Sequence, residues 1–329
     1  MKKVSFIVVL VMILAMLLSA CSTQTASQKI KIALVLPSTV DDLSWSQGMT
    51  EGVKAAQKEL GEDKVEVAIS ERLGNPTDAA AAIRQYASQG YDLIIAHGSQ
   101  YQSILDEIAK EFPKTSFAYG TGFQAHDNIF AYDPQSQEGA YLQGIIAGKL
   151  TKSNIIGIVG PIEAGDAIKY NVGFQQGVKS VNPNADVRVA YTGSFGDIAK
   201  ASELAKAQID AGADILTGTA QQTVGAIKAC AEKPGIYWLG NDMDQSSIAP
   251  DTVLSAQAYD WKNVVMQMIK FRQEGKVGGE HLVLSLANGG IQLVFNQKLA
   301  NVIPADVMAL VEQAKKDIIA GKLTIELPK

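Results

Sequence analysis

The stretch at residues 35–48 reads V-L-P-S-T-V-D-D-L-S-W-S-Q-G, and it passes from an apolar strand through a polar loop into a helix. Trp45 lies in the polar loop, between two serines and after two aspartates. An indole in such a setting has no obvious core to enter. We therefore predict that Trp45 stands at the mouth of a cleft and stacks on a flat ligand. The alternative interpretation is an N-terminal staple, in which Trp45 packs against its own helix.

Strands and helices alternate on both sides of this stretch. Residues 29–36 read K-I-K-I-A-L-V-L and predict a strand, whereas residues 46–60 have helical periodicity and precede Gly61, a C-terminal cap. Further strands are predicted at residues 64–70, 93–97, 116–119, 129–132, 155–160, 187–191, 215–218, 236–240 and 253–258, and further helices at 75–89, 101–112, 138–150, 166–181, 198–210, 222–232, 261–274 and 304–320. This alternation predicts an α/β fold with doubly wound parallel sheets.

The length of the chain and an internal sequence repeat indicate two similar lobes. The chain has 329 residues, and a single core stops growing beyond about 250–300 residues. Residues 84–95 read R-Q-Y-A-S-Q-G-Y-D-L-I-I, and residues 206–217 read K-A-Q-I-D-A-G-A-D-I-L-T. Both contain a helix end, a glycine, an aspartate two residues later and an apolar strand. Many helix-to-strand connections in α/β folds share this pattern, so the repeat is moderate support for two lobes.

The first residues resemble the signal of a bacterial lipoprotein. Two lysines precede an apolar run at residues 6–18, and L-S-A-C follows at residues 18–21. The run is shorter than the about 20 residues that a spanning helix needs, and a positive start with small residues at the end is typical of a secretory signal. The pattern is similar to a lipobox, which implies a signal peptide at residues 1–20, lipidation of Cys21 and a flexible tether up to residue 28. The alternative is an ordinary cleaved signal that ends near a cysteine.

Charge and cysteine content exclude several classes of partner. Loss of the signal would remove two of the 29 Lys and Arg residues and none of the 34 acidic residues, which leaves a formal charge of about −7. Phosphate backbones attract basic surfaces, so no nucleic acid is expected. His97, His126 and His281 lack metal-ligand spacing, and we expect no metal and no cofactor. Cys230 lies in a helical pattern and should be a small buried residue.

The sequence lacks the motifs of common enzyme and nucleotide sites. There is no G-x-S-x-G nucleophile elbow, no phosphate loop ending in G-K-S or G-K-T, and no G-x-G-x-x-G. Four aspartates on predicted loops could perform acid–base chemistry, but they serve equally well as acceptors for the hydroxyls of a bound ligand. They are Asp41, Asp42, Asp242 and Asp244. We favour the second interpretation and expect a binding protein that is not an enzyme.

Candidate ligand contacts gather in the loops after the predicted strands, because ligands of open α/β sheets bind beyond the carboxyl ends of the strands. These loops contain Asp41, Asp42, Ser44, Trp45, Ser46, Gly98, Ser99, Gln100, Gly120, Thr121, Gly122, Phe195, Asp197, Thr219, Ala220, Gln221, Asn241, Asp242 and Asp244. The set is polar, with one aromatic residue from each half of the chain. Trp45 and Phe195 could therefore clamp a planar heterocycle across a cleft.

Stacking alone would not hold such a heterocycle tightly. A base stacked on an aromatic side chain gains about 1–3 kcal/mol, so two faces would give roughly 2–6 kcal/mol, whereas micromolar binding needs about 8 kcal/mol. Hydrogen bonds to the ring edge, or to an attached sugar, must supply the rest. In the alternative interpretation Phe195 packs beneath the following helix, and Asp197 only caps that helix.

Five stretches together resemble one family. They are D-L-S-W-S-Q at residues 42–47, G-F-Q-Q-G at 173–177, Y-T-G-S-F-G-D at 191–197, A-G-A-D-I-L at 211–216 and L-G-N-D-M-D-Q at 239–245. In these stretches the chain is similar to the basic membrane protein family of bacterial lipoproteins, which includes purine-nucleoside receptors and adenine-binding relatives. The resemblance covers nearly the whole mature chain. It implies a type I periplasmic-binding-protein fold, delivery of a ligand to an ABC transporter, and a purine held between two aromatic rings.

The resemblance also implies roles for individual residues. The two aromatic positions match Trp45 and Phe195, and a ribose-binding aspartate of the nucleoside receptors matches Asp242. Two positions depart from the nucleoside receptors. Ser46 stands where they carry an asparagine, and Tyr259 stands where they carry a lysine. The resemblance therefore leaves open both a free purine base and a nucleoside.

We predict a monomeric, extracytoplasmic, lipid-anchored solute-binding protein that captures a purine base or nucleoside and passes it to the permease of an ABC importer. The predicted contacts are Asp42, Ser44, Trp45, Ser46, Gly98, Ser99, Thr121, Gly122, Phe195, Thr219, Asn241, Asp242 and Tyr259. The alternatives are a sensor lipoprotein that signals to a membrane partner, a nucleoside-cleaving enzyme, and a sugar-binding protein of the same fold.

The fold analogy predicts a three-segment hinge, and hinge motion would close the lobes on the ligand. Its crossings are expected near Asp133, Tyr259 and Gly279. The first lobe would then comprise residues 29–133 and 259–279, and the second residues 134–258 and 280–329. We also expect residues 282–286 and 291–295 to form a hairpin around Asn288-Gly289-Gly290.

Overall fold

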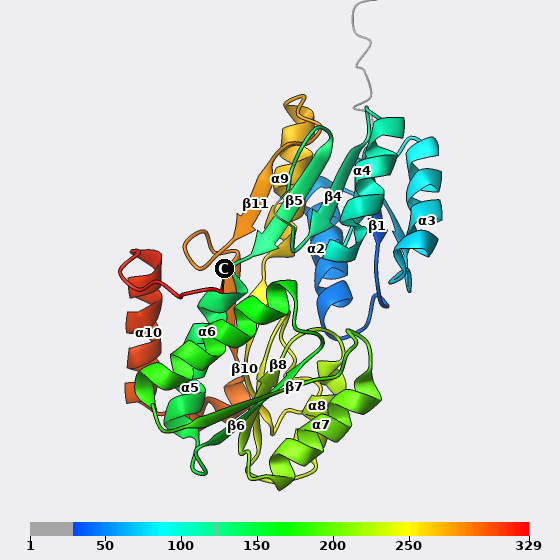
Figure 1. The fold of residues 1–329 in the computed structure, drawn as a ribbon. Helices are drawn as coiled ribbons and strands as arrows, with labels where there is room; N and C mark the ends of the chain where they lie inside the picture. The colour runs from blue at the N-terminus through cyan, green and yellow to red at the C-terminus, as the bar shows by residue number, and fades with distance from the viewer. Residues whose placement is uncertain (1–28, 123, 329) are drawn as a thin grey trace, which may run out of the picture.

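The computed structural model describes residues 29–122 and 124–328, so the predicted signal peptide, Cys21 and the tether lie outside the described residues. The described chain forms two lobes, each built around a six-stranded sheet (Figure 1). The predicted α/β fold with two parallel-sheet lobes is confirmed. Within the described ranges, no helix combines the length and the apolar character that crossing a bilayer requires.

The first sheet has the strand order β11-β5-β4-β3-β1-β2, and all neighbouring strands run parallel. Its strands are β1 (Ile30–Val35), β2 (Val65–Ser70), β3 (Leu93–Ala96), β4 (Ser116–Gly120), β5 (Ile129–Pro134) and β11 (His281–Leu284). The short strand β3 reads L-I-I-A and is buried throughout. Such an uninterrupted apolar run is expected for a parallel strand that is covered by helices on both faces.

The second sheet has the strand order β12-β10-β9-β8-β6-β7. Its strands are β6 (Ile155–Gly160), β7 (Asp186–Tyr191), β8 (Ile215–Gly218), β9 (Tyr237–Gly240), β10 (Val253–Tyr259) and β12 (Ile291–Phe295). The neighbouring strands run parallel except for β12, which is antiparallel to β10 at the edge.

Helices cover both faces of the first sheet because side chains alternate along its strands. In β1, Ile32 and Leu34 belong to the core that includes α2 (Trp45–Leu60) and α9 (Trp261–Gln273). The neighbouring residues Ala33 and Val35 belong to the core on the other face. That second core includes residues of α3 (Pro76–Ser88) and α4 (Gln102–Glu111), which follows the short 3₁₀ segment η2 (Ser99–Tyr101).

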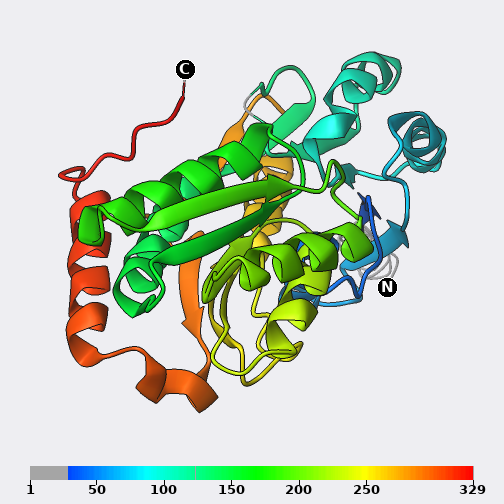
Figure 2. The same cartoon turned by 60° about the horizontal axis from the view of Figure 1, so that its bottom comes forward.

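The second lobe repeats this arrangement. The helices α5 (Ser136–Leu150) and α6 (Gly165–Val181) lie side by side over one face, and α7 (Ile198–Asp210) and α8 (Thr223–Ala231) lie over the other (Figure 2). In β6, Ile156 and Ile158 join the core of the first pair, whereas Val159 joins the core of the second. A 3₁₀ segment, η3 (Gln297–Val302), leads to the last helix α10 (Ala305–Ile319), which packs against α5.

The internal sequence repeat, residues 84–95 and 206–217, occupies the same place in both lobes. Gly90 follows α3 and Gly212 follows α7, with φ angles of 72° and 99° that suit glycine best. The strands that follow are β3 and β8, and each lies one position from the first strand of its lobe, next to β1 and β6 respectively. The sequence repeat therefore corresponds to a structural repeat.

The chain passes between the sheets three times. It leaves the first sheet after β5, returns after β10 through α9, and leaves again after β11. The helix α9 packs on α2 so closely that a Cβ atom at Gly52 would lie 2.6 Å from the Cβ of Trp261. The first two passages lie near Asp133 and Tyr259, where the sequence predicted crossings.

The third connection between the sheets differs from two predictions. We placed the last crossing near Gly279 and a hairpin at residues 282–286 and 291–295. In the structure β11 pairs in parallel with β5, and β12 pairs antiparallel with β10, so the two strands belong to different sheets. The chain crosses between Leu284 and Ile291, and residues 281–284 belong to the first sheet. The turn residues at Asn288-Gly289-Gly290 therefore form the crossing itself.

Candidate functional site

A cavity of about 620 Å³ lies between the two lobes. Its walls are made by segments that follow β1, β2, β3 and β4 in the first lobe and β6, β7, β8 and β9 in the second. It is therefore at the carboxyl ends of both sheets, where open α/β folds bind ligands. The lining residues are Pro37, Trp45, Gly74, Gly98, Ser99, Gln100, Thr121, Ile162, Ala164, Gly165, Asp166, Ala167, Gly193, Ser194, Phe195, Gly196, Thr219, Ala220, Gln221, Asn241 and Asp242.

Trp45 is the first residue of α2, and His97 holds its indole in place. The indole stacks on the His97 imidazole with ring centroids 4.2 Å apart and planes 10° apart. The indole Nε1 donates a hydrogen bond to the His97 carbonyl at 3.0 Å, and His97 Nε2 lies 3.1 Å from the Trp45 carbonyl. The ring of Trp261 lies nearly perpendicular to the indole, with ring centroids 5.1 Å apart. One face of the indole is therefore covered by protein, while the residue also lines the cavity.

The protonation state of His97 follows from its burial. Complete burial lowers the pKa of His97 to about 3, so the imidazole is neutral at physiological pH. Its Nε2 faces the Trp45 carbonyl and must carry the proton. Its Nδ1 therefore accepts a hydrogen bond from the Tyr132 hydroxyl, 2.7 Å away. This arrangement makes His97 a rigid support for Trp45, and the sequence analysis assigned His97 no role.

Phe195 lies in the loop between β7 and α7 and lines the same cavity as Trp45. Its side chain is 46% exposed, which is unusual for a large apolar residue. The backbone around it is held by a hydrogen bond from the Gln222 amide to the Phe195 carbonyl at 3.0 Å. Asp197, two residues later, accepts a hydrogen bond from the Lys200 amide and caps α7. The structure thus brings the two predicted aromatics, one from each lobe, to one cavity.

Asp242 is a buried acid that lines the cavity. Its side chain is buried, and this burial raises the pKa of Asp242 to about 7, with further contributions from the negative charges of Asp166 and Asp42. Ser44 of the first lobe donates a hydrogen bond to Oδ2 of Asp242, and Asn241 donates one to Oδ1 at 2.7 Å. The first of these bonds joins the two lobes at the cavity. A second such link runs from Gln245 Nε2 to the Leu43 carbonyl at 3.3 Å.

Thr219 is buried and lines the cavity, and its Oγ1 has no hydrogen-bond partner among the described residues. A buried hydroxyl without a partner is costly. Gly98, Ser99 and Thr121 also line the cavity from the first lobe, and Thr121 adopts a positive φ of 51°. These four residues therefore all line the cavity.

Five predicted contacts do not line the cavity. The Asp42 carboxylate accepts hydrogen bonds from the backbone amides of Ser44, Ser46 and Gln47, so it caps α2. Burial raises the pKa of Asp42. The hydroxyl of Ser44 binds Asp242 instead of facing the cavity. The hydroxyl of Ser46 is enclosed and has no hydrogen-bond partner within residues 29–122 and 124–328.

The remaining two residues of this group support the site from behind. Tyr259 donates a hydrogen bond from its hydroxyl to Asn241 Oδ1 at 3.1 Å and accepts one from Gln257 Nε2 at 2.9 Å. It thereby orients Asn241, which does line the cavity. Gly122 packs against a tyrosine ring, since a Cβ at this position would lie 2.1 Å from Tyr119.

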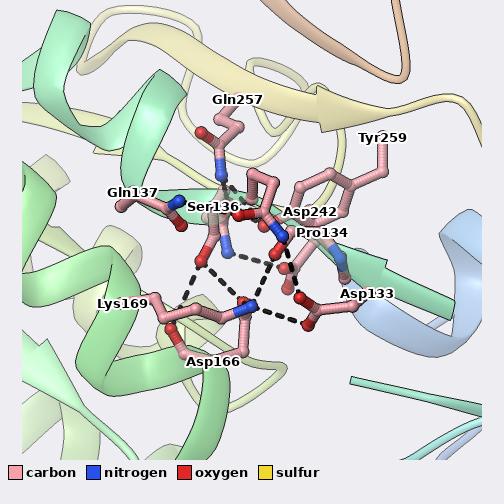
Figure 3. Close-up of polar contacts among 11 residues, drawn as sticks. Asp133, Pro134, Ser136, Gln137, Asp166, Lys169, Asp242, Gln257 and Tyr259 are labelled. Atoms are coloured by element: carbon pink, nitrogen blue, oxygen red, sulfur yellow. Dashed lines mark hydrogen bonds and ion pairs between the residues drawn. The ribbon is translucent and has the colours of Figure 1, made fainter. Parts of the chain in front are cut away.

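Asp166, in the first turn of α6, lines the cavity but was not among the predicted contacts. Ser136 donates a hydrogen bond to its Oδ1 at 2.6 Å, and Lys169 Nζ lies 3.3 Å from the same atom (Figure 3). Lys169 also forms a tighter ion pair with Asp133 at 2.6 Å. The available signal was positional, because Asp166 follows β6 after one short loop.

Two further features of the described residues concern cysteine and metal chemistry. Cys230 is buried, as predicted, and burial raises the pKa of its thiol. Within residues 29–122 and 124–328, no group of three His, Cys, Asp or Glu side chains is arranged to hold a metal ion. The site therefore offers a wall of aromatic and small residues with a few polar groups, which is the usual make-up of a small-molecule site.

Known proteins resemble this chain over most of its length. A purine-binding protein of Brucella abortus is 30% identical over 298 residues, which cover 91% of this chain and 83% of that protein. The nucleoside-binding protein BmpA of an ABC transporter of Lactococcus lactis is 27% identical, with 90% and 89% covered. A solute-binding protein of an ABC transporter system from Aeropyrum pernix matches the fold with a TM-score of 0.80 at 24% identity, over 91% of this chain and 94% of that one.

The family model described as ABC transporter substrate-binding protein PnrA-like matches residues 29–326. This match spans nearly all of the described chain, both lobes and every segment that lines the cavity. The chain therefore belongs to the Bmp family of PnrA-like substrate-binding proteins of ABC transporters, as its sequence motifs indicated.

Proposed function

We propose that this substrate-binding protein captures a purine base or nucleoside between Trp45 and Phe195. The observation that carries the proposal is that these two rings come from different lobes and line one cavity. His97 covers one face of the Trp45 indole, so a ligand would stack on the other face. The exposed ring of Phe195 gains an apolar partner when a flat ligand enters.

The size and polarity of the cavity support a ligand of this class. Its volume of about 620 Å³ falls in the range of about 300–1,000 Å³ that small-molecule sites occupy. Two stacked faces would supply roughly 2–6 kcal/mol. The polar groups of Thr219, Asn241 and Asp242 would supply the hydrogen bonds that micromolar binding requires in addition. Two relatives have names that state purine or nucleoside binding, and they match this chain along most of its length.

We further propose that the protein is held outside the cytoplasm by lipidation of Cys21 and delivers its ligand, as a monomer, to the permease of an ABC importer. Support comes from the lipobox-like residues 18–21 and from the family, whose members serve ABC transporters. Detergent phase partition of the full chain tests the anchor. We expect the protein in the detergent phase and the Cys21→Ala variant in the aqueous phase, and equal partition of both would contradict the anchor.

Calorimetry with a ligand panel tests the bound class directly. We would titrate the pure protein with adenine, hypoxanthine, adenosine and inosine, and with ribose and glucose as matched sugars. We expect at least micromolar affinity for one or more of the purines and none for the sugars. Binding of a sugar alone would refute the purine proposal and favour a sugar-binding protein. Mass spectrometry of the molecule that co-purifies would give an independent answer.

The same samples test whether the protein is an enzyme. After incubation with adenosine or inosine, chromatography should recover the intact nucleoside. Release of free base over many turnovers would instead assign a cleavage reaction to the aspartates of the cavity.

A further inference from the structure

Asp166 lies on the second-lobe wall of the cavity, and no sequence motif pointed to it. It is held in the first turn of α6, and its side chain is only 14% exposed. Burial raises the pKa of Asp166, and the positive charge of Lys169 opposes this rise. Burying a carboxylate in this position costs free energy unless its oxygens accept hydrogen bonds or form ion pairs.

Within the part of the chain that the structure describes, only one of the two carboxylate oxygens has partners. The Ser136 hydroxyl donates a hydrogen bond to Oδ1 at 2.6 Å. Lys169 Nζ forms an ion pair with the same oxygen at 3.3 Å. Among the described residues, no hydrogen bond reaches Oδ2. Lys169 is shared, because it binds Asp133 at 2.6 Å and donates a hydrogen bond to the Pro134 carbonyl at 2.7 Å (Figure 3).

A second polar group in the cavity also lacks a partner. The Thr219 hydroxyl is fully enclosed and unpaired among the described residues, although Thr219 lines the same space as Asp166. Native structures leave few buried polar groups unsatisfied. Oδ2 of Asp166 differs from this hydroxyl because it is not enclosed, so a molecule in the cavity that Asp166 lines can reach it.

We propose that Asp166 is a ligand-binding residue that accepts a hydrogen bond at Oδ2 from an N–H or O–H donor of the bound molecule. This inference rests on the proposed purine function and deepens it, because it requires the ligand to present a donor to the α6 wall. In a free base the donor is a ring N–H or the exocyclic amine, and in a nucleoside it can also be a ribose hydroxyl. A charge-assisted bond of this kind is roughly twice as strong as a neutral one.

Asp133 offers a matched control. It pairs with the same lysine as Asp166 but does not line the cavity. Asp133→Asn and Asp166→Asn both remove one negative charge from Lys169 and change no side-chain volume appreciably. Only Asp166→Asn replaces a carboxylate that faces the ligand.

Calorimetry with adenine and adenosine would compare the wild type with both variants, after thermal melting has shown that they are folded. We expect Asp166→Asn to weaken the better of the two ligands at least tenfold and Asp133→Asn to weaken it less than threefold. Should Asp166→Asn not fold, Asp166→Ser, which keeps a short polar group, addresses the same question.

Analogues then identify the donor. They are 9-methyladenine, which lacks the N9–H, N6,N6-dimethyladenine, which lacks both hydrogens of the exocyclic amine, and 2′-deoxyadenosine, which lacks the 2′-hydroxyl. The analogue without the donor that Asp166 binds should have the same affinity for the wild type and for Asp166→Asn. Equal losses in Asp166→Asn and Asp133→Asn would overturn this inference and leave the purine proposal standing. A wild type that binds neither adenine nor adenosine would overturn both.

Discussion

Trp45 and Phe195 differ in how firmly the protein holds each ring. Trp45 stacks on His97, donates a hydrogen bond to its carbonyl and meets the edge of Trp261. Phe195 stands in a loop with 46% of its surface exposed. A preorganised ring loses little freedom on binding, whereas an exposed ring contributes mainly the apolar surface that the ligand covers. The two residues should therefore respond differently to truncation.

Trp45→Ala should weaken purine binding about tenfold, because about 1–3 kcal/mol of stacking is lost and each 1.4 kcal/mol corresponds to about a factor of ten. The protein should stay folded but melt at a lower temperature, since the substitution also removes the indole from its packing against His97. Calorimetry and thermal melting measure the two effects. Unchanged affinity would remove Trp45 from the site.

Phe195→Ala should weaken binding to a similar extent and leave the melting temperature nearly unchanged, since the ring has little packing to lose. Ile198→Ala is a matched control, because Ile198 is 48% exposed, lies close by in sequence and does not line the cavity. A loss of affinity in the control equal to that in Phe195→Ala would mean that the loop, and not the ring, matters.

Asp242 should make stability depend on pH. Burial raises its pKa from the ordinary value of 3.8 to about 7 in the folded protein, so between these values the folded state binds the proton more tightly than the unfolded state. The stability that this proton contributes is complete below about pH 4 and is lost as the pH rises through about 7. Denaturant unfolding at pH 5 and 8 should show a larger fall in unfolding free energy for the wild type than for Asp242→Asn. The exposed residue Asp41 provides a control through Asp41→Asn, which should behave as the wild type does.

At the scale of elements, the motif G-F-Q-Q-G belongs to the contact between α5 and α6. A Cβ at Gly173 would lie 2.3 Å from the Gln137 carbonyl oxygen, and one at Gly177 would lie 2.0 Å from that of Tyr141. Two helices can approach this closely only where one of them has no side chain. A motif that resembled a family signature therefore has a packing role, and neither of these glycines lines the cavity.

Gly177→Ala should lower the unfolding free energy by about 1–3 kcal/mol, the usual cost of overpacking a core. Denaturant titration measures this loss, and Ser180→Ala on the exposed part of the same helix is the control. Equal stability of Gly177→Ala and the wild type would show that α5 and α6 can separate without cost.

The strands β11 and β12 show where an element depends on its neighbours. Their sequences and the glycines between them are typical of a hairpin, yet each strand pairs with a different sheet. Local turn residues favour a reversal of the chain, but they do not specify which edge a strand joins. The free edges of β5 and β10 decided the pairing, and neither edge is visible in the sequence of residues 281–295.

At the scale of the whole molecule, the cavity is shared by two lobes that the chain connects three times. A ligand that contacts Trp45 and Phe195 binds both lobes and should stabilise them together. At a ligand concentration of 100 times the dissociation constant, the gain is about 2.7 kcal/mol. Adenine or adenosine, whichever binds, should therefore raise the melting temperature in a single calorimetric transition. Two separate transitions, of which only one shifts, would place the ligand within one lobe.

Most of the helices and strands could be predicted because their signals are local. Helical periodicity, apolar runs, caps and turn residues all act within a few positions, and the structure confirmed these elements to within a few residues at their ends. The rule that ligands lie beyond the carboxyl ends of strands also needs only the order of elements. It directed attention to Trp45, Phe195, Thr219 and Asp242, which share the cavity.

Only the tertiary structure decided what each polar side chain faces. Asp42 and Asp242 are both aspartates on loops after strands, yet Asp42 caps a helix and Asp242 lies at the cavity. Asp166 lines the cavity because two residues hold it there. Ser136 lies at the start of α5, and Lys169 lies three residues further along α6. Hydrogen bonds extend only about 3 Å and depend on direction, so the partner of a side chain follows from how distant segments pack and not from its sequence neighbours.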